Sequence, residues 1–466
     1  MNTSRSVALS AIILGLAATS LAAQASLPPA TRASIDSAVK AAMARSGAPS
    51  VSIAVVKDGA IAYANAYGLA KLASNTPAAP AMRYSIGSVS KQFTATCILL
   101  LVEQKKLSLD DKIAKWFPDV TRAKDISVRQ LLNMTSGISD FWPQDYVMTS
   151  MLKPITADEI IARWAKAPLD FEPGSKYQYS NTNYVIAGRI VELVSGKPFV
   201  AFLREHILTP LGLESAFITD DGVLPPSDPN GYYRYALASP RIAPKEGKGW
   251  LWAAGELAMT ASDLARWDIA MIDRKVLKPA SYREQQRATI LTDGRASEYA
   301  LGVTVGTFNG HREVSHGGAV SGFTTQNSVF PDDRAAIVVQ TNFDGGDPQS
   351  IEQSIARILF SGANDPATER AIAQVKAILP ELQAGRIDRG LLTQNASDYF
   401  SNEALADFAS SLGKLGACSE VNQVASGQRG GMSFRAFRTM CGKTGLIVVT
   451  RAIPSGKLEQ FLVYPE

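Results

Sequence analysis

The chain has 466 residues, of which 46% are hydrophobic and 19% charged, so it can bury a sizeable core in two or three domains. Its formal net charge of +4 is not gathered into a basic run, which argues against nucleic acid as a partner. Three histidines without ligand-like spacing argue against a zinc site, and nothing in the sequence implies a metal or an organic cofactor.

Residues 1–25 have the pattern of a secretory signal. Arg5 gives a positive start, an apolar stretch follows over 7–23, and residues 23–25 (Ala-Gln-Ala) form a small-residue cleavage site. The stretch is alanine-rich and short for a membrane-spanning helix, so cleavage is favoured over a retained anchor. No later stretch could span a bilayer. We therefore expect an exported chain, periplasmic or secreted, without a stable membrane span.

Residues 26–362 are expected to form the first domain. A helix is followed by strands at 51–56 and 60–66, which flank a Lys-Asp-Gly turn signal. The pattern from Ser88 to about Leu213 is mainly helical. Further strands are expected at 302–307, 312–316, 322–330 and 335–341. Strands at both ends with helices between them predict an α/β (α+β) domain, in which a sheet built from distant segments carries a helical insertion.

A break in the pattern at 361–366 precedes a second predicted domain, residues 363–466. We expect a small α+β unit without a catalytic constellation, made of helices near 368–382 and 402–412 and strands at 432–438, 445–451 and 459–464. Its two cysteines, Cys418 and Cys441, could pair in an oxidising compartment, whereas Cys97 lies in an apolar helix and reads as a buried thiol.

The pair Ser88 and Lys91 is the leading candidate for catalysis. A spacing of three residues puts both side chains on one face of a helix, and a lysine desolvated among apolar neighbours can take a proton from serine. The same spacing recurs in less favourable contexts, namely a solvated helix face, a segment ending in proline and a glycine-flanked polar helix, at Ser37/Lys40, Ser150/Lys153 and Ser411/Lys414. Only the helix after Ser88 is apolar nearly all round.

Two other segments supply groups that such a pair needs. Tyr179 offers a phenol that can shuttle a proton if cationic neighbours lower its pKa, and Asn181 offers an amide that can bind a substrate. The similar Tyr63-Ala64-Asn65 lies in the first strand pair and reads as structural. The glycines after His316 would allow a close backbone approach, and this histidine can donate to tyrosine or to a substrate carboxylate.

Three motifs in this order resemble the serine hydrolases of the class C β-lactamase and penicillin-binding-protein superfamily. They are Ser88–Lys91 (Ser-Val-Ser-Lys), Tyr179–Asn181 (Tyr-Ser-Asn) and His316–Gly318 (His-Gly-Gly). Supporting pieces match at Leu131–Gly137 and Pro173-Gly174, and the resemblance covers about residues 30–360. It implies an antiparallel sheet flanked by helices with an all-helical insertion.

The resemblance also implies a role for each motif residue. Ser88 is the implied nucleophile, Lys91 acts as general base together with Tyr179, and the backbone amides of Ser88 and Ala319 form the oxyanion hole. Substrate positioning is implied for Asn181, His316, Gly317 and Gly318.

One departure from the superfamily concerns the third motif, which is Lys-Thr-Gly in β-lactamases. A Lys-Thr-Gly does occur at 443–445, but it lies in the second domain, so we read it as coincidence and assign the position to His316. A role for Lys443 through a contact between domains remains as an alternative.

The sequence thus predicts an exported serine hydrolase that cleaves an amide or ester through a Ser88 acyl-enzyme. A peptidase of D-aminopeptidase or DD-peptidase type is favoured, with a carboxylesterase or a weak β-lactamase as alternatives, and a non-hydrolytic cell-wall binder or sensor as an alternative of another class. The partner is a small-molecule or peptide substrate, and the oligomeric state is left open. Trp142, Trp250 and Trp252 either line the cleft or belong to the core.

Overall fold

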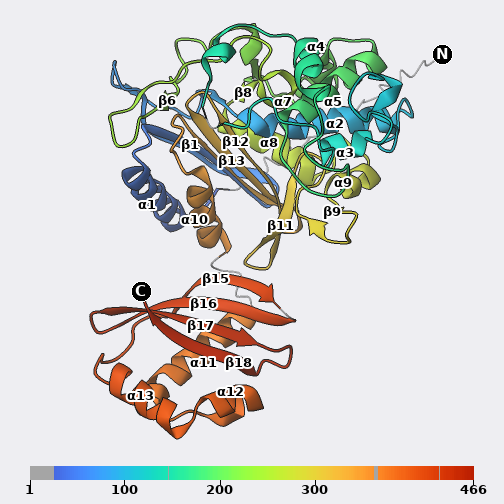
Figure 1. Ribbon diagram of the computed structural model, residues 1–466. Helices are drawn as coiled ribbons and strands as arrows, with labels where there is room; N and C mark the ends of the chain where they lie inside the picture. The colour runs from blue at the N-terminus through green and yellow to red at the C-terminus, as the bar shows by residue number, and fades with distance from the viewer. Residues whose placement is uncertain (1–25, 145, 361–365, 430) are drawn as a thin grey trace, which may run out of the picture.

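The computed structural model of the protein describes residues 26–144, 146–360, 366–429 and 431–466 (Figure 1). The predicted signal segment and the predicted domain boundary at 362/363 lie outside these residues, so both stay predictions. The first part of the chain is built on a seven-stranded antiparallel sheet of order β11-β12-β13-β14-β1-β2-β3. Its strands are β1 (Ser50–Lys57), β2 (Ala60–Lys71), β3 (Thr76–Pro77), β11 (Thr304–Phe308), β12 (His311–Val320), β13 (Phe323–Phe330) and β14 (Ala335–Thr341).

The centre of this sheet joins two segments that lie far apart in the sequence. Strand β1 pairs with β14 from Val51 opposite Thr341 to Val56 opposite Ala336. Both strands are buried along almost their whole length, because helices cover both faces of the sheet, and this explains why they read as apolar runs rather than as alternating patterns. The prediction of a sheet built from distant segments is confirmed.

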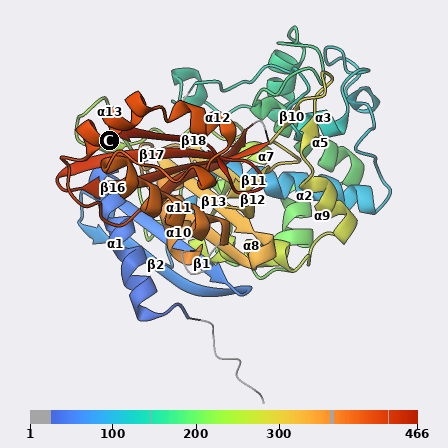
Figure 2. The same cartoon turned by 90° about the horizontal axis from the view of Figure 1, so that it is seen from below.

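Alternate residues of β1 face two different cores. Ile53 and Val55 pack in a cluster with α1 (Pro29–Ser46) and α10 (Pro348–Phe360), two helices that contact each other. Ala54 and Val56 belong to a larger cluster that includes α8 (Ala261–Ile272) on the opposite face. Figures 1 and 2 show the resulting three layers, with α1 and α10 on one side of the sheet and α8 on the other.

A mainly helical region lies beyond α8, as the sequence predicts. Its helices are α2 (Ser90–Glu103), α3 (Val128–Leu132), α4 (Ala157–Ile160), α5 (Asn181–Ser195), α6 (Phe199–Leu203), α7 (Trp252–Gly255) and α9 (Pro279–Gln285). Short strand pairs and triplets connect them, namely β4 (Tyr84–Ser85), β5 (Phe217–Ile218), β6 (Tyr232–Tyr233), β7 (Arg241–Ile242), β8 (Leu257–Met259), β9 (Thr289–Ile290) and β10 (Ala296–Ser297). Helix α2 is buried on nearly every face and contacts both α5 and α7. Within the described ranges, no helix is both long and apolar enough to cross a bilayer.

Strand β12 is longer than the sequence predicts. The expected strand ends at 316, but the observed one continues through Gly317 and Gly318 to Val320, opposite Gln326, Thr325 and Phe323 of β13. Glycine usually weakens a strand, which hides this extension from sequence patterns, but it also admits a neighbouring backbone at close range.

The last part of the chain folds as a four-stranded antiparallel sheet with helices packed on it (Figure 1). The elements are α11 (Pro366–Gln383), α12 (Gln394–Tyr399), α13 (Asn402–Leu412), β15 (Asn422–Arg429), β16 (Met432–Cys441), β17 (Thr444–Ala452) and β18 (Leu458–Pro465). The sequence predicts α11, α13 and the last three strands. It misses α12 and the polar edge strand β15, which lacks apolar alternation.

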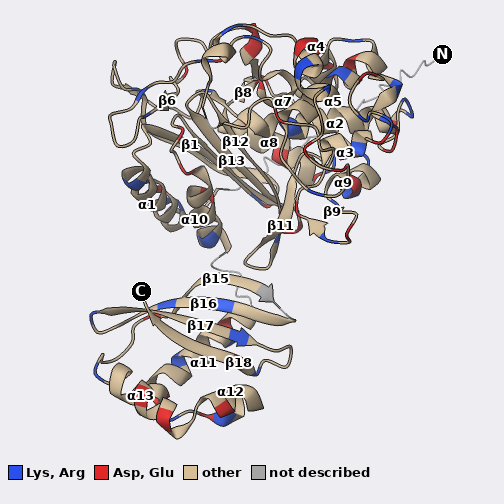
Figure 3. Ribbon diagram, in the orientation of Figure 1, with Lys and Arg blue, Asp and Glu red and all other residues tan. Residues whose placement is uncertain are grey.

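The charges on the strands of this C-terminal unit are mostly basic, whereas its helices carry both signs. In Figure 3, basic residues lie along β16 and β17, and acidic residues lie on α12 and α13. In the seven-stranded sheet, by contrast, β13 and β14 contain no charged residue, because both strands are buried.

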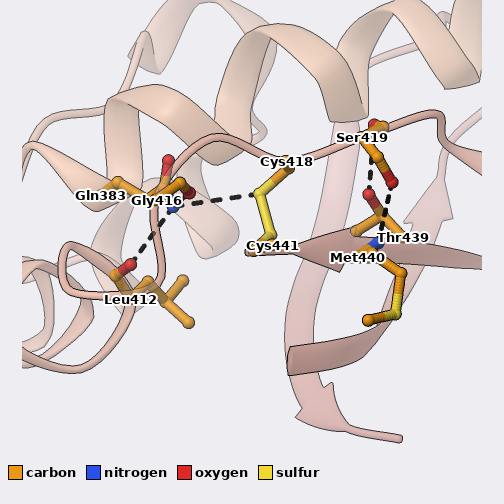
Figure 4. Close-up of a disulfide and its surroundings, with 8 residues drawn as sticks. All are labelled: Gln383, Leu412, Gly416, Cys418, Ser419, Thr439, Met440 and Cys441. Atoms are coloured by element: carbon orange, nitrogen blue, oxygen red, sulfur yellow. Dashed lines mark hydrogen bonds between the residues drawn. A yellow bond between two sulfur atoms is a disulfide. The ribbon is translucent and has the colours of Figure 1, made fainter. Parts of the chain in front are cut away.

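A disulfide joins Cys418 to Cys441 at the end of β16 (Figure 4). Beside it, the Gln383 amide donates to the carbonyl oxygens of Leu412 and Gly416, at 3.2 and 2.8 Å. The disulfide and the amide together tie the sheet to the ends of α11 and α13. Cys97 is a buried free thiol in α2, as expected.

Candidate active site

Ser88 lies in a tight turn rather than in the helix that follows it. Gly87–Val89 form a single 3₁₀ turn, and α2 begins at Ser90. Gly87 has a φ of 51°, and a side chain there would place its Cβ 2.9 Å from the backbone nitrogen of Ala319. Glycine at this position therefore allows the Ser88 turn to lie directly against β12.

Lys91 is fully buried and donates to three acceptors. Its Nζ lies 2.9 Å from Ser88 Oγ, 2.8 Å from Asn181 Oδ1 and 2.8 Å from the Ala254 carbonyl oxygen. Burial lowers the pKa of Lys91 to about 7, against the attraction of Asp140, which raises it. The predicted desolvation of this lysine is therefore present.

The three contacts define how a neutral Lys91 would be oriented. A neutral amine has two N–H bonds and one lone pair. The carbonyl oxygens of Asn181 and Ala254 can only accept, so they hold the two N–H bonds, and the lone pair then faces the Ser88 hydroxyl. This is the arrangement that a general base requires before it can take the serine proton.

Tyr179 is packed over the same lysine. Lys91 Nζ lies 4.9 Å from the centre of the phenol ring, and the phenol is hydrogen-bonded to Ser88. Burial raises the pKa of Tyr179, so the condition that cationic neighbours lower it is not met. The phenol is neutral here and has a proton to give.

Both ring nitrogens of His316 are occupied. Nδ1 lies 2.5 Å from the carbonyl oxygen of Gly317, which can only accept, so Nδ1 carries the proton. Nε2 therefore accepts from the Tyr299 hydroxyl, at 2.8 Å. Burial and, to a smaller extent, the neighbouring Lys91 lower the pKa of His316 to about 4, so the ring is neutral at pH 7. The tyrosine that His316 meets is Tyr299 rather than Tyr179, and no N–H remains for a substrate carboxylate.

Gly318 brings strand β12 against the Ser88 turn. A Cβ on this residue would lie 2.0 Å from the backbone oxygen of Ile86 and 3.1 Å from the backbone nitrogen of Ser88. Any side chain at this position would therefore clash with the backbone before Ser88. Ala319 follows immediately and faces Gly87. The two backbone segments that carry the expected oxyanion-hole amides, those of Ser88 and Ala319, are thus in contact.

These residues open into one large cleft with a volume of about 1680 Å³. Ser88, Tyr179, Asn181 and the predicted third motif line it, together with Ala319, whereas Lys91 lies buried beneath. Trp142 and Trp250 also line the cleft. Trp252 is not among the lining residues and packs on Phe199 instead, with ring centres 5.5 Å apart.

Three groups that contact the candidate catalytic residues were not predicted from the sequence. Asp140 accepts from both nitrogens of Asn181, Tyr299 bonds His316, and the Ala254 carbonyl binds Lys91. Asp140 follows Gly137 by three positions, so the matching segment 131–137 ends just short of it. The other two have no local signal, because a backbone carbonyl and an isolated tyrosine belong to no motif.

The remaining candidates lie elsewhere. Tyr63 donates to Asp36 of α1 at 2.5 Å, in keeping with a structural role for the Tyr63–Asn65 segment. Lys443 lies in the turn between β16 and β17 and is not among the residues that line the cleft. Among the residues that the structure describes, no group of three His, Cys, Asp or Glu side chains is placed to hold a metal ion.

Comparison with known proteins places these observations in a family. The Beta-lactamase family pattern matches residues 35–360. A D-aminopeptidase of Brucella anthropi is 30% identical over 303 residues, which are 63% of this chain and 56% of the relative, so the chain spans little more than half of that protein. Penicillin-binding protein 4* of Bacillus subtilis is 26% identical over 367 residues, covering 75% of this chain and 81% of the relative.

Solved structures agree in fold. A D-stereospecific amidohydrolase from a Streptomyces species is 26% identical with a TM-score of 0.61, covering 68% of this chain and 96% of that one. An octameric penicillin-binding protein homologue from Pyrococcus abyssi has a TM-score of 0.63 at 21% identity, covering 93% of this chain and 95% of that one. The predicted class of fold is confirmed, and the chain belongs to the beta-lactamase family.

Proposed function

We propose that the chain is a serine hydrolase that cleaves amide bonds through an acyl-enzyme on Ser88. The observation that carries this proposal is the contact of Lys91 Nζ with Ser88 Oγ at 2.9 Å, with two carbonyl oxygens fixing the other hydrogens of the amine. A lysine pKa of about 7 lets a large fraction of the enzyme hold its base deprotonated near neutral pH.

The reaction would begin with attack by Ser88 Oγ on the substrate carbonyl carbon. Its proton passes to Lys91, and the backbone N–H groups of Ser88 and Ala319 stabilise the oxyanion. The C–N bond then breaks as Tyr179 protonates the departing amine, and the Lys91 ammonium returns a proton to Tyr179. Water releases the acyl group by the reverse proton path. Asn181 would position the substrate, and Gly317 and Gly318 would admit it alongside β12.

For the substrate, we propose a peptide or amide of a D-amino acid. The similarity to a D-aminopeptidase and to a D-stereospecific amidohydrolase supports this class. His316 is neutral and both of its ring nitrogens are hydrogen-bonded within the protein, so it offers no positive charge to a substrate. This disfavours substrates whose carboxylate, next to the scissile bond, must pair with a cation. Efficient β-lactamase activity is therefore not expected.

We also propose that the chain is exported to the periplasm or the medium, with residues 1–25 as the leader. This part of the proposal rests on the sequence pattern alone. Amino-terminal sequencing of the mature protein recovered from the producing cell tests it, with a first residue near position 26 as the expected result.

The catalytic proposal is tested by intact-mass analysis after exposure to a fluorophosphonate, with the wild type beside Ser88→Ala. We expect one adduct in the wild type and none in the variant. Turnover of a D-alanyl amide, a short p-nitrophenyl ester and a chromogenic cephalosporin is measured in parallel. Ester turnover alone would refute the amidase assignment, and the absence of both adduct and turnover would favour a binding protein.

A further inference from the structure

We infer that Asp140 is a positioning residue for the reaction, because it fixes the amide of Asn181 so that the oxygen and not the nitrogen faces Lys91. The inference rests on the proposed function, since it concerns how the general base is aimed at Ser88. It starts from two hydrogen bonds that no sequence motif indicates.

Asp140 lies partly buried in the loop after Ile138 and reaches the first residue of α5. Its Oδ1 accepts from the backbone N–H of Asn181 at 2.9 Å and from that of Trp142 at 3.2 Å. Its Oδ2 accepts from Asn181 Nδ2 at 3.2 Å. One carboxylate therefore holds both the backbone and the side chain of Asn181, at a helix end whose N–H groups lack partners within the helix.

A carboxylate can only accept hydrogen bonds, so it selects one of the two possible orientations of the Asn181 amide. The NH₂ group turns toward Asp140, and Oδ1 is left for Lys91 Nζ at 2.8 Å. In the opposite orientation, the amide would present N–H bonds to Lys91. The lone pair of a neutral Lys91 would then turn toward those N–H bonds and away from Ser88.

Asp140 also acts on Lys91 through its charge. The groups that face Lys91 are the neutral phenols of Tyr179 and Tyr184, with ring centres 4.9 and 5.5 Å from Nζ, and the neutral ring of His316. Asp140 is the carboxylate whose attraction raises the pKa of Lys91 against burial. Burial raises the pKa of Asp140 itself, while its hydrogen bonds from Trp142 and Asn181 and the nearby Lys91 favour the ionised form.

The first experiment measures the rate at which a fluorophosphonate labels Ser88 as a function of pH. In Asp140→Asn the acid limb of this profile should move about one pH unit lower, because the charge that favours the lysine ammonium is gone. The maximal rate should fall at least about tenfold, because the amide of Asn181 is no longer held in one orientation. Asp140→Glu keeps the charge, so its acid limb should stay at the wild-type pH.

Asp344→Asn is the matched control. Asp344 is another carboxylate that lines the cleft. Its side chain accepts a backbone N–H from Gly322 at 2.8 Å, and it is not among the groups that shift the pKa of Lys91. Its removal should leave the acid limb in place. Asp140→Ser serves as a second neutral variant should the asparagine variant fail to fold, and tryptophan fluorescence verifies folding in each case.

A double-mutant cycle separates positioning from a general structural effect. If Asp140 acts through Asn181, the loss of maximal rate caused by Asp140→Asn should shrink at least fivefold in an Asn181→Ala background. Losses that simply multiply, or an acid limb that does not move in either neutral variant, would overturn the inference. Absence of Ser88 labelling in the wild type would instead refute the proposed function, so the two failures are distinguishable.

Discussion

Burial of Lys91 should cost the protein stability in a pH-dependent way, and Lys91→Met isolates this cost. The side chain has no exposed surface, and burial lowers its pKa from 10.5 to about 7. Methionine has a similar length and no charge. The variant loses the proposed base, so we expect it to be inactive but more stable than the wild type at neutral pH.

The sign follows from proton binding in the two states. Between pH 7 and 10.5 the unfolded chain binds a proton at Lys91 that the folded chain does not, so the free energy of unfolding rises with pH across this window. The stabilising contribution of a neutral Lys91 side chain is fully present above pH 10.5 and is lost as pH falls through about 7. The whole shift corresponds to about 5 kcal/mol, or about 1.4 kcal/mol per pH unit within the window.

The assay is urea unfolding followed by tryptophan fluorescence from about pH 7.5 to about pH 9.5. All six tryptophans precede residue 268, so the signal reports the domain that contains Lys91 and not the C-terminal unit. The wild type minus Lys91→Met difference cancels other titrating groups and should change by about 3 kcal/mol across this range. Parallel curves for the two proteins would refute the burial argument.

Three further changes test other parts of the structure. Gly318→Ala should lower the rate of Ser88 labelling at least about 100-fold, because the new methyl group would push β12 away from the Ser88 amide, and labelling kinetics measure this. Replacing Cys418 and Cys441 by serine opens a loop spanned by 23 residues and should cost the C-terminal unit about 3 kcal/mol, which calorimetry with and without reductant measures. Lys443→Ala should leave labelling unchanged, and a clear loss would bring the C-terminal Lys-Thr-Gly into the active site.

Much of the catalytic core is readable from the sequence because its signals are local. Ser88 and Lys91 are three residues apart. The 3₁₀ turn at Gly87–Val89 and the first turn of α2 are therefore enough to bring their side chains together. The apolar character of α2 predicts the desolvation of Lys91. Strands β1 and β14 likewise stand out as apolar runs, because the cores on both sides of the sheet demand them.

The parts that were missed depend on contacts between distant segments. Asp140 meets Asn181 across 41 positions, and the Ala254 carbonyl reaches Lys91 across 163. Tyr299 occupies Nε2 of His316 by a hydrogen bond and so keeps this nitrogen from a substrate, although nothing near Tyr299 in sequence indicates a site. Such pairings follow from the packing of α2, α5, α7 and β12 around one point, which a single sequence does not encode in any local pattern.

The charges around Ser88 bear on the substrate more directly than any single motif does. Lys91 is neutral in a large fraction of molecules near pH 7, and His316 is neutral with both nitrogens engaged. Among the described residues that line the cleft, Arg234 is the one cationic side chain, and it lies in the β6–β7 segment and packs over Phe343. The acidic lining residues are Asp140, Asp170, Asp344 and Asp347.

Carboxylates therefore outnumber cations four to one among the described charged residues that line the cleft, so its electrostatics disfavour a substrate carboxylate. A neutral or amine-bearing amide meets no such penalty. The neutral His316 at the position predicted for the third motif and the acidic lining of the cleft both act in this direction. For the proposed amidase, we therefore expect neutral or amine-bearing amides to be cleaved faster than β-lactams, which carry a carboxylate.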